Sequence, residues 1–542
     1  MKDVRRKVAS DNRFYFAQNL LQSKKSTFPV PVEIMFNYLG QLQQLESKSS
    51  LFSQYGDLLD VQLSEGFSDI GIDTPRFALL EVSAIVLSSK LHMTFRYNTH
   101  MRHQQRIRDW AYQCKQVFEE DILDLKDFVP EPTLSDYPLL PLTYDSLNRM
   151  MKNTLPKVGI QSWDMVEDIY PCTPVQEGIL LNQLRNPRGY MFSGIYEAQN
   201  LGGAGKVNSK RLRKAWAMVV ARHPVLRTLF IDASYRGGSF DQVVVKNLDD
   251  DVFEINSSDS DACDLLEKVD HLSMSNKRSL KVPQQLTICT SPSGRVWIKV
   301  EGSNTIMDGG SIDLLLRDLA LAYNNQLPAG PGPLFSDYIK HIRSQTEEET
   351  LSNWTRYLSG VTPCHLSTLS RASKDRQQRS FMISFDRFHE LHNFCEKNSI
   401  TLSNITLSAW AIVLRSFTES DDICFGYPSA GRDSSVPGIQ DAVGVFINML
   451  CCRVKFTTGQ SLLDISNCVQ DDYIRNLPHQ NCSLAQIQHE IGHQGQMLFD
   501  SVLSIQNHTF QRGSTEKGIT FEYRKGHDPS EVSHGPHFQT DY

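Results

Sequence analysis

The sequence predicts an α/β fold in which mixed β-sheets are covered by helices. Residues 296–300 (VWIKV) form an extended apolar stretch, and residues 312–319 (IDLLLRDL) follow it with apolar side chains at helical spacing. Between residues 91 and 97 apolar and polar side chains alternate as in a half-buried strand, and a helical pattern follows over residues 107–117. Strand and helix patterns therefore succeed one another along the chain.

Composition restricts the class of protein. A chain of 542 residues is long enough for two to four domains, and 40% hydrophobic with 22% charged residues is typical of a soluble globular protein. The formal net charge of −7, with no long lysine or arginine run, argues against a nucleic-acid partner. No stretch approaches the length of a membrane span, and no apolar segment follows the basic N-terminus, so neither a membrane protein nor a secretory signal is expected.

Cysteine usage predicts a reduced, cytoplasmic setting. The eleven cysteines are scattered, odd in number and without a C-x-x-C pair, which argues against a disulfide framework. Cys451 and Cys452 are adjacent and admit two interpretations, a redox-active pair or two strand residues facing opposite sides. The apolar run at residues 446–450 just before them favours the strand.

Proline placement and motif content divide the chain into three regions. Residues 1–127 contain the motif FNYLG at 36–40, the alternating strand and the helix after it. Residues 128–165 are predicted to form an extended inter-domain linker, because four prolines stand among polar residues: Pro130, Pro132, Pro138 and Pro141. Residues 166–542 carry the remaining motifs.

The third region begins with two motifs that adjoin predicted helices. Residues 168–178 (DIYPCTPVQEG) place Thr173 as a helix cap, with Pro174 at the first helical position. Residues 222–230 (RHPVLRTLF) follow a helix whose apolar stripe consists of Leu212, Ala215, Trp216, Val219 and Val220. Residues 303–309 (SNTIMDG) then occupy the turn between the strand at 296–300 and the next helix, a frequent location for functional groups.

These motifs, in this order, resemble the condensation domains of nonribosomal peptide synthetases. Residues 303–309 are similar to the Ser-His-x-x-x-Asp-Gly variant of fungal terminal, ring-closing domains. Further matching segments are GRD at 431–433, VGVFINML at 443–450, YIR at 473–475 and LFDSVLSIQN at 498–507. The resemblance implies two lobes, each similar to chloramphenicol acetyltransferase.

The resemblance also sets expectations for both ends of the chain. Residues 36–40 and 95–101 are similar to the closing segments of epimerisation domains, which share the condensation fold. Residues 1–127 are therefore expected to be the C-terminal remnant of an epimerisation-like domain. After residue 531 the resemblance to condensation domains ends, so the second lobe is expected to be truncated.

Members of the resembled family join a donor and an acceptor that are carried as thioesters on phosphopantetheine arms. The resemblance thus implies carrier (thiolation) domains as partners, with adenylation domains adjacent to them. The phosphopantetheine belongs to the carriers, and no cofactor is expected to be bound by this chain itself. LGGAGK at 201–206 lacks both the serine of a carrier motif and the spacing of a phosphate-binding loop.

Asn304 occupies the position at which the second histidine of the family contacts the acceptor nucleophile. Asparagine offers an acceptor oxygen but no basic site at neutral pH. Loss of general-base catalysis costs about 10²–10⁴-fold in rate, which predicts a slow or inactive enzyme. Three alternatives remain: the amide orients the nucleophile, Asn304 is an ordinary turn residue, or the chain is a non-catalytic remnant that binds carrier proteins.

The other candidate site residues are implied by the resemblance. Asp308 and Gly309 complete the signature with Asn304, and Ser303 precedes it. Asp308 is expected to pair with an arginine, for which the resemblance indicates Arg432, and the alternative is an exposed turn aspartate. Glycine at 309 and 310 is expected to allow special backbone angles or close approach. Structural support is expected from Arg222 and Arg227, with His223 as a structural residue rather than a substitute base.

One metal motif competes with this assignment. Residues 489–493 (HEIGH) fit H-E-x-x-H, in which two histidines on one helical face bind zinc and Glu490 acts as a base. Gly492 weakens the helix that this arrangement requires. We therefore expect no metal site, and a solvated histidine pair is the alternative to a zinc hydrolase.

Overall fold

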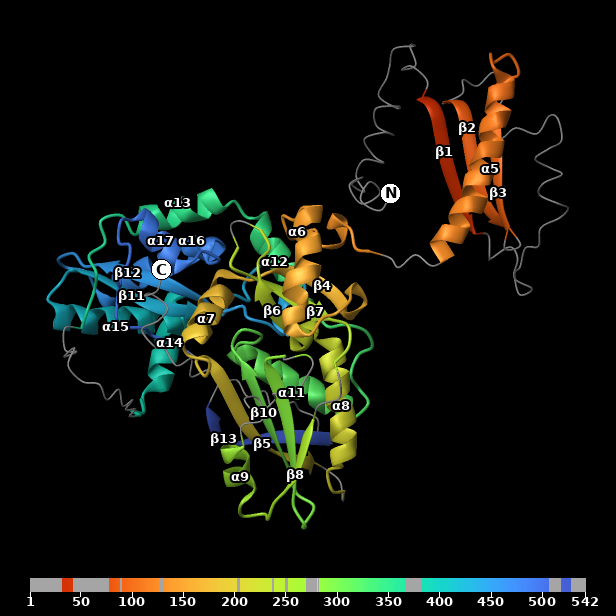
Figure 1. Ribbon diagram of the computed structural model, residues 1–542. Helices are drawn as coiled ribbons and strands as arrows, with labels where there is room; N and C mark the ends of the chain where they lie inside the picture. Colours follow the sequence, from red (N-terminus) through yellow and green to blue (C-terminus); the bar gives the residue numbers. More distant parts are fainter. Residues whose placement is uncertain are drawn as a thin grey trace. The chain divides into compact units, whose positions relative to one another are not determined.

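The computed structural model shows two compact units, residues 1–131 and 132–542 (Figure 1). The structure describes residues 32–41, 78–87, 90–126, 131–201, 205–235, 238–248, 252–269, 280, 282–366, 382–505 and 518–527. The C-terminal tail, where the family motifs end, lies outside the described residues.

The first unit contains a three-stranded sheet with one helix. Its strands follow the order β1 (Val32–Gln41), β2 (Ala78–Leu87) and β3 (Lys90–Tyr97), and α5 spans Gln104–Lys126. β1 and β2 are parallel, whereas β2 and β3 are antiparallel. The predicted strand at 91–97 and the helix after it are confirmed, and Ile107 of α5 packs against Leu80 and Val82 of the sheet.

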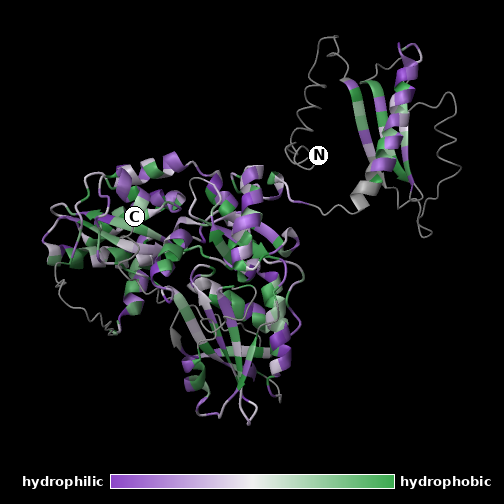
Figure 2. Ribbon diagram, in the orientation of Figure 1, coloured by the Kyte–Doolittle hydropathy of each residue, from purple (hydrophilic) through white to green (hydrophobic). Residues whose placement is uncertain are grey.

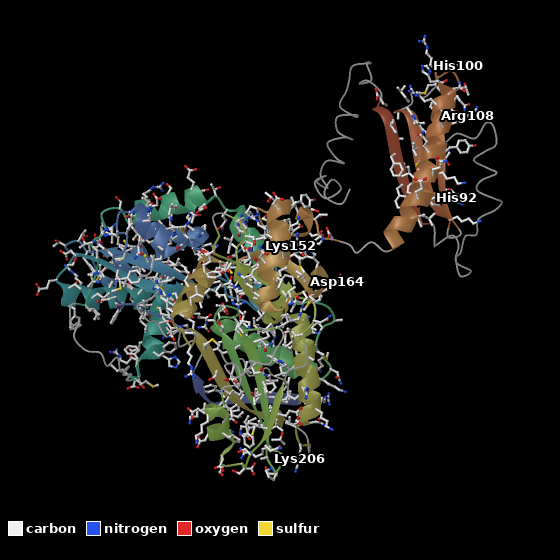
Figure 3. The ribbon with its side chains drawn as sticks, viewed as in Figure 1. His92, His100, Arg108, Lys152, Asp164 and Lys206 are labelled. Atoms are coloured by element: carbon white, nitrogen blue, oxygen red, sulfur yellow. The ribbon has the colours of Figure 1, made fainter. Side chains whose placement is uncertain are left out.

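The prediction of an extended linker is wrong for residues 132–165, which are folded into the second unit. They form short helical segments: η1 (Leu134–Asp136), α6 (Tyr144–Arg149), η2 (Met150–Thr154), η3 (Leu155–Val158) and η4 (Trp163–Met165). Met150, Leu155 and Ile160 are fully buried in one core cluster with strand residues of the first lobe. Pro132, Pro138 and Pro141 misled the prediction because they lie beside or between short helical turns, and residues 128–130 lie outside the described residues. Lys152 and Asp164 mark the outer surface of this segment (Figure 3).

The first lobe of the second unit begins with a small antiparallel sheet. Its order is β4 (Val166–Pro171), β7 (Phe240–Val245) and β6 (Thr228–Asp232). Helix α7 (Pro174–Arg185) leaves the end of β4. As predicted, Thr173 caps this helix, its side chain accepting a hydrogen bond from the Gln176 amide, and Pro174 is its first residue.

A larger mixed sheet forms the rest of the first lobe. Its described strands follow the order β13 (Gly518–His527), β5 (Met191–Leu201), β10 (Val296–Ser303), β9 (Gln284–Thr290) and β8 (Phe253–Asn256). Helices α8 (Ser209–Arg222) and α11 (Gly309–Tyr323) share one core cluster with this sheet, and α9 (Ala262–Lys268) belongs to another (Figure 1). The predicted stripe of α8 is buried at Leu212, Ala215, Trp216 and Val219.

The second lobe packs helices around two long antiparallel strands. The strands are β11 (Asp422–Ser429) and β12 (Asn448–Lys455), and the helices are α13 (Glu347–Tyr357), α14 (Phe388–Asn398), α15 (Leu402–Thr418), α16 (Leu462–Asn476) and α17 (Leu484–Glu490). α12 (Phe335–Ser344) lies between the lobes, because it shares a core cluster with Tyr170 of β4 and with Phe446. The core of the second lobe is hydrophobic along both strands and the inner face of α15 (Figure 2). Cys451 and Cys452 are consecutive buried residues of β12, as the strand interpretation predicts, and all eleven cysteines are free thiols.

Among the described residues, no single helix has both the length and the apolar character of a membrane span. The pair α14 and α15, bent by 108° at its break, passes the test of length and composition only when taken together. α15 buries Ile405, Ala411 and Leu414 among other residues of the second lobe.

Candidate functional site

The segment singled out by the sequence lies on the turn between β10 and α11, as predicted. The backbone N–H of Asn304 donates to the carbonyl of Tyr190 at 2.8 Å, and the N–H of Asp308 donates to the carbonyl of Gly444 at 3.0 Å. The intervening Ile306 and Met307 are fully buried in the core of the first lobe. The turn is thus fixed by its own apolar residues and by backbone contacts to two other segments.

Asn304 is half-buried, and its Oδ1 atom is shielded from solvent without a hydrogen-bond partner among the described residues. A buried amide oxygen without a donor costs about 1–3 kcal/mol, so such atoms are rare unless a ligand or water satisfies them. At this site the amide can accept a hydrogen bond from an N–H or O–H group. It cannot take up a proton near pH 7.

Asp308 is the N-cap of α11 and is largely buried, so the alternative of an exposed turn aspartate is wrong. Its Oδ1 accepts from the Ser311 N–H at 3.0 Å, and its Oδ2 accepts from the Phe446 N–H at 3.1 Å. Arg432 Nη2 lies 3.2 Å from Asp308 Oδ1, which places the arginine indicated by the resemblance in an ion pair. The carboxylate therefore joins the first turn of α11 to the segment before β12.

Arg432 is held by more than its ion pair. Its Nη1 donates to the carbonyls of Ile439 and Ala442, each at 2.8 Å, and its guanidinium lies 4.4 Å from the ring centroid of Phe446. A buried arginine needs hydrogen-bond acceptors for its guanidinium N–H groups, and here carbonyls and a carboxylate supply them. The pair thus forms a fixed link between the two lobes.

The expectation of special backbone angles at the two glycines is wrong, because neither Gly309 nor Gly310 has a positive φ. Both are helical residues at the start of α11. A Cβ at Gly310 would lie 3.4 Å from Arg432 Nε, which is close to an ordinary van der Waals contact, so the packing does not by itself require this glycine. Left-handed backbone occurs instead at Tyr190, φ 59°, whose carbonyl receives the Asn304 amide.

Two glutamines of α7 bind the turn on either side of Asn304. Gln183 Nε2 donates to Ser303 Oγ at 2.9 Å, and Gln176 Nε2 donates to the Thr305 carbonyl at 2.7 Å. Ser303 and Thr305 are both almost completely buried. The serine at 303 is therefore a hydrogen-bond acceptor inside the turn.

Arg222 lies in a structural network at the end of α8. Arg222 Nε and His223 Nε2 contact the same Asp318 oxygen, at 3.1 and 2.9 Å. Burial alone raises the pKa of Asp318, but its bonds to His223 and Arg317 lower it below the ordinary value. His223 is 2% exposed and bound to this carboxylate, which agrees with a structural role.

The buried guanidinium of Arg227 forms a separate network with several backbone carbonyls. It donates to the carbonyls of Val220 and Val245 and contacts Glu167 Oε2 at 2.5 Å. It therefore ties the end of α8 to β7 and β4. The partners of Arg222 and Arg227 thus lie outside the turn that carries Asn304.

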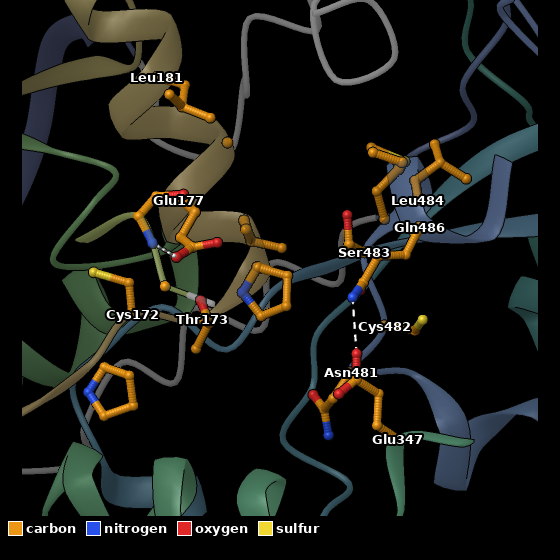
Figure 4. Close-up of a pocket in the computed structure, with 18 of the residues that line it drawn as sticks. Cys172, Thr173, Glu177, Leu181, Glu347, Asn481, Cys482, Ser483, Leu484 and Gln486 are labelled. Atoms are coloured by element: carbon orange, nitrogen blue, oxygen red, sulfur yellow. Dashed lines mark hydrogen bonds between the residues drawn. The ribbon is translucent and has the colours of Figure 1, made fainter. Parts of the chain in front are cut away.

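A cleft of about 1270 Å³ lies between the two lobes, and residues 303–309 are not among those that line it. Its first-lobe wall consists of one face of α7 and the residues just before it, among them Cys172, Thr173, Glu177 and Leu181 (Figure 4). Its second-lobe wall includes Glu347, Asn481, Ser483, Leu484 and Gln486. Tyr190 also lines the cleft, and burial raises its pKa to about 12. The backbone contact between Tyr190 and Asn304 places the turn beside the cleft.

Two acidic groups, one in the first-lobe wall and one outside the cleft lining, have raised pKa values. Burial raises the pKa of Asp241 to about 7, an effect that its hydrogen bond from Tyr235 opposes. Burial likewise raises the pKa of the Cys172 thiol well above its ordinary value, so this cysteine is a poor nucleophile. Burial therefore favours the neutral form of both groups.

The zinc interpretation of residues 489–493 fails on geometry. α17 ends at Glu490, and Gly492 has φ 79°, so His489 and His493 do not share a helical face. His489 is exposed beside Glu490, and within the described part of the chain no group of three metal-ligating side chains occurs.

Sequence reasoning missed Gln176, Gln183, Gln242 and Ser311. Two signals were present: Gln176 stands within the opening motif, and Gln183 follows it at a spacing of seven residues, two helical turns. Neither signal identifies a partner, because a buried amide has no charge or periodicity that predicts what it binds.

The comparisons with known proteins agree with this geometry. The Condensation domain family model matches residues 166–542. Nonribosomal peptide synthetase 1 of Aspergillus fumigatus is 53% identical over 537 residues, which cover 98% of this chain and 8% of that protein. Nonribosomal peptide synthetase nlsA of Emericella nidulans is 49% identical over 536 residues, covering 98% and 9%. The chain thus spans less than a tenth of the length of these curated relatives.

Among solved structures, the condensation domain from Monacolin K polyketide synthase MokA is similar with a TM-score of 0.53 at 17% identity. The match covers 67% of this chain and 86% of that chain. The predicted α/β, two-lobed fold of the chloramphenicol-acetyltransferase type is confirmed by this likeness.

Proposed function

Because the chain belongs to the condensation-domain family of fungal nonribosomal peptide synthetases, we propose that it acts between two carrier-bound thioesters. In this proposal an acceptor amine or hydroxyl meets Asn304, just after β10, and attacks the donor carbonyl. The thioester C–S bond breaks, the donor's pantetheine thiol leaves, and the product is an amide from an amine or an ester from a hydroxyl, either linear or closed into a ring. Turnover is slow or absent, because Asn304 supplies no base.

The observation that carries this proposal is the unpartnered, buried Oδ1 of Asn304, a residue whose backbone is bonded to Tyr190 in the wall of the interlobe cleft. An acceptor N–H or O–H satisfies this oxygen and is thereby oriented. The proton released during attack must then leave by another route, such as solvent or a second substrate molecule. Orientation on two tethered arms is retained, and it contributes independently of base catalysis.

The scaffold around Asn304 supports a site that is formed rather than collapsed. Asp308 remains paired with Arg432, and Ser303 and Thr305 remain bound by glutamines. Only the side chain that meets the acceptor departs from the family signature. The phosphopantetheine arms of the carriers enter as parts of the substrates, and adenylation domains are the expected suppliers of the loaded carriers.

Finer assignments rest on sequence resemblance. Ser303 supports membership of the terminal, ring-closing-like group, and residues 36–40 and 95–101 support an epimerisation-like remnant in the first unit. Free thiols at all eleven cysteines support a reducing, cytoplasmic setting.

A second candidate is a non-catalytic module that binds carrier proteins without turnover. It is favoured by the same feature, the lack of a basic group at Asn304. Product formation from a panel of aminoacyl-loaded carrier pairs tests both candidates, with the unaltered chain compared with Asn304→His and Asn304→Ala. Product from the unaltered chain above the Asn304→Ala level supports the enzyme. Product from Asn304→His alone supports the non-catalytic module, and no product from any variant contradicts the condensation function.

A further inference from the structure

We propose that Gln176 and Gln183 of α7 are positioning residues that hold Asn304 toward the acceptor from both sides of the turn. This inference rests on the proposed function, in which Asn304 contacts the acceptor nucleophile. Neither glutamine touches the reacting atoms in this account. Both act through the backbone and side chains that adjoin Asn304.

Gln183 controls the residue before Asn304. Its Nε2 carries two hydrogens, and the amide spans two acceptors at 2.9 Å each, Ser303 Oγ and the carbonyl of Gly189. Gly189 immediately precedes Tyr190, whose carbonyl receives the Asn304 N–H. One side chain therefore connects the two backbone segments that meet at Asn304.

Gln176 controls the residue after Asn304 as half of a buried amide pair. Gln176 and Gln242 are fully buried, and each Nε2 donates to the other's Oε1, at 2.9 and 3.0 Å. The second hydrogen of Gln176 reaches the Thr305 carbonyl at 2.7 Å, and that of Gln242 reaches the Pro171 carbonyl at 3.1 Å. All four amide hydrogens are used, and such satisfied networks fix side-chain positions.

The two glutamines contact the turn, while another face of α7 lines the cleft. Residues seven apart lie on one side of a helix, two turns distant from each other. Glu177, Leu181 and Asn182, from the remaining face, line the cleft. A ligand packed in the cleft therefore contacts the same helix that holds residues 303 and 305.

The test uses two small pantetheine derivatives that differ only in the presence of the acceptor amine. Glycyl-pantetheine amide carries the amine, and acetyl-pantetheine amide lacks it, so the ratio of their dissociation constants isolates the amine contact. One hydrogen bond worth about 1–1.4 kcal/mol corresponds to a ratio of about fivefold to tenfold. Calorimetry on the unaltered chain should give such a ratio, and Asn304→Ala should reduce it to about one.

Gln183→Leu is the primary variant because Gln183 is half-buried, and Gln176→Leu is the second. Both variants should reduce the ratio of the two dissociation constants to about one, while the affinity for acetyl-pantetheine amide stays that of the unaltered chain. Gln470→Leu is the matched control, because Gln470 makes three hydrogen bonds in the second lobe and does not line the cleft. It should keep the ratio even if it lowers stability. An unchanged ratio in both α7 variants would overturn the proposal.

A second measurement separates this inference from the proposed function. If the unaltered chain binds the glycyl and acetyl derivatives equally tightly, the proposed acceptor contact at Asn304 is wrong. The positioning role of the two glutamines is then tested by the rate of amide hydrogen exchange in the peptide spanning residues 303–308. Faster exchange in Gln183→Leu or Gln176→Leu, but not in Gln470→Leu, supports positioning of the turn. Equal exchange in all four chains overturns it.

Discussion

Asp308 and Arg432 lie 124 residues apart and form a buried ion pair across the two lobes, with 3.2 Å between Oδ1 and Nη2. Both partners also bind the backbone of the segment at residues 442–446: Asp308 accepts from the Phe446 N–H, and Arg432 donates to the Ala442 carbonyl. The turn that presents Asn304 is thereby fixed to the segment leading into β12.

Removing one member of this pair should destabilise the chain strongly. Arg432→Leu leaves a buried carboxylate without its cation, and we expect a loss of about 3–5 kcal/mol in the free energy of unfolding. Urea unfolding measures this loss. The control is Arg415→Leu, because Arg415 and Asp421 form an exposed pair, for which about 0–1 kcal/mol is expected. Equal losses in the two variants would contradict a structural role for the buried pair.

Replacing Gly431 by alanine should destabilise the chain more than replacing another glycine with a similar backbone conformation. Gly431 has φ 66°, and a Cβ would lie 1.8 Å from the Phe446 carbonyl oxygen. Gly459 has φ 84°, but a Cβ added there would meet no described atom within 4 Å, so Gly459→Ala carries only the backbone strain of about 1–2 kcal/mol. Thermal unfolding of both alanine variants should show a clearly larger loss for Gly431→Ala. A similar loss would mean that the backbone near Arg432 moves freely.

Stability should depend on pH through Asp241. Its pKa is raised by burial to about 7, above the unfolded value near 4, so the folded state binds the extra proton between these values. This contribution is fully present below about pH 4 and is lost as pH rises through 7, by about 1.4 kcal/mol per pH unit. Asp241→Asn should therefore gain stability relative to the unaltered chain from pH 4 to 7. Denaturant melts at several pH values check this, and a pH-independent difference would contradict it.

The zinc interpretation leads to a prediction of its own. Because α17 ends before His493, Glu490→Gln and His489→Ala should leave the metal content unchanged. Elemental analysis after dialysis against zinc should find no stoichiometric metal. Zinc bound at one equivalent and lost in His489→Ala would reverse this conclusion.

The sequence could predict the features that depend on local chemistry. The β10–turn–α11 arrangement follows from an apolar run, a turn and an apolar helical stripe, and the Thr173 cap follows from a local hydrogen bond with Pro174 at the first helical position. The resemblance supplied Arg432, which no local pattern connects to Asp308.

The rest depends on tertiary packing. Residues 132–165 have the pattern of a linker because their apolar side chains are spread over short turns. Those side chains are buried by packing against β4, β6 and β7. The glutamines of α7 resemble ordinary polar helix residues until the fold brings residues 303 and 305 against them. Burial of polar groups is decided by partners that are distant in sequence.

The pH–rate profile of product formation tests the central claim most directly, that Asn304 stands at the acceptor position without a base. Asn304→His should raise the single-turnover rate at pH 7.5 by about 10²–10⁴-fold, with a rate that climbs through the imidazole pKa near 6.5. The unaltered chain should show no such rise. Equal rates and equal profiles in the two chains would contradict the account.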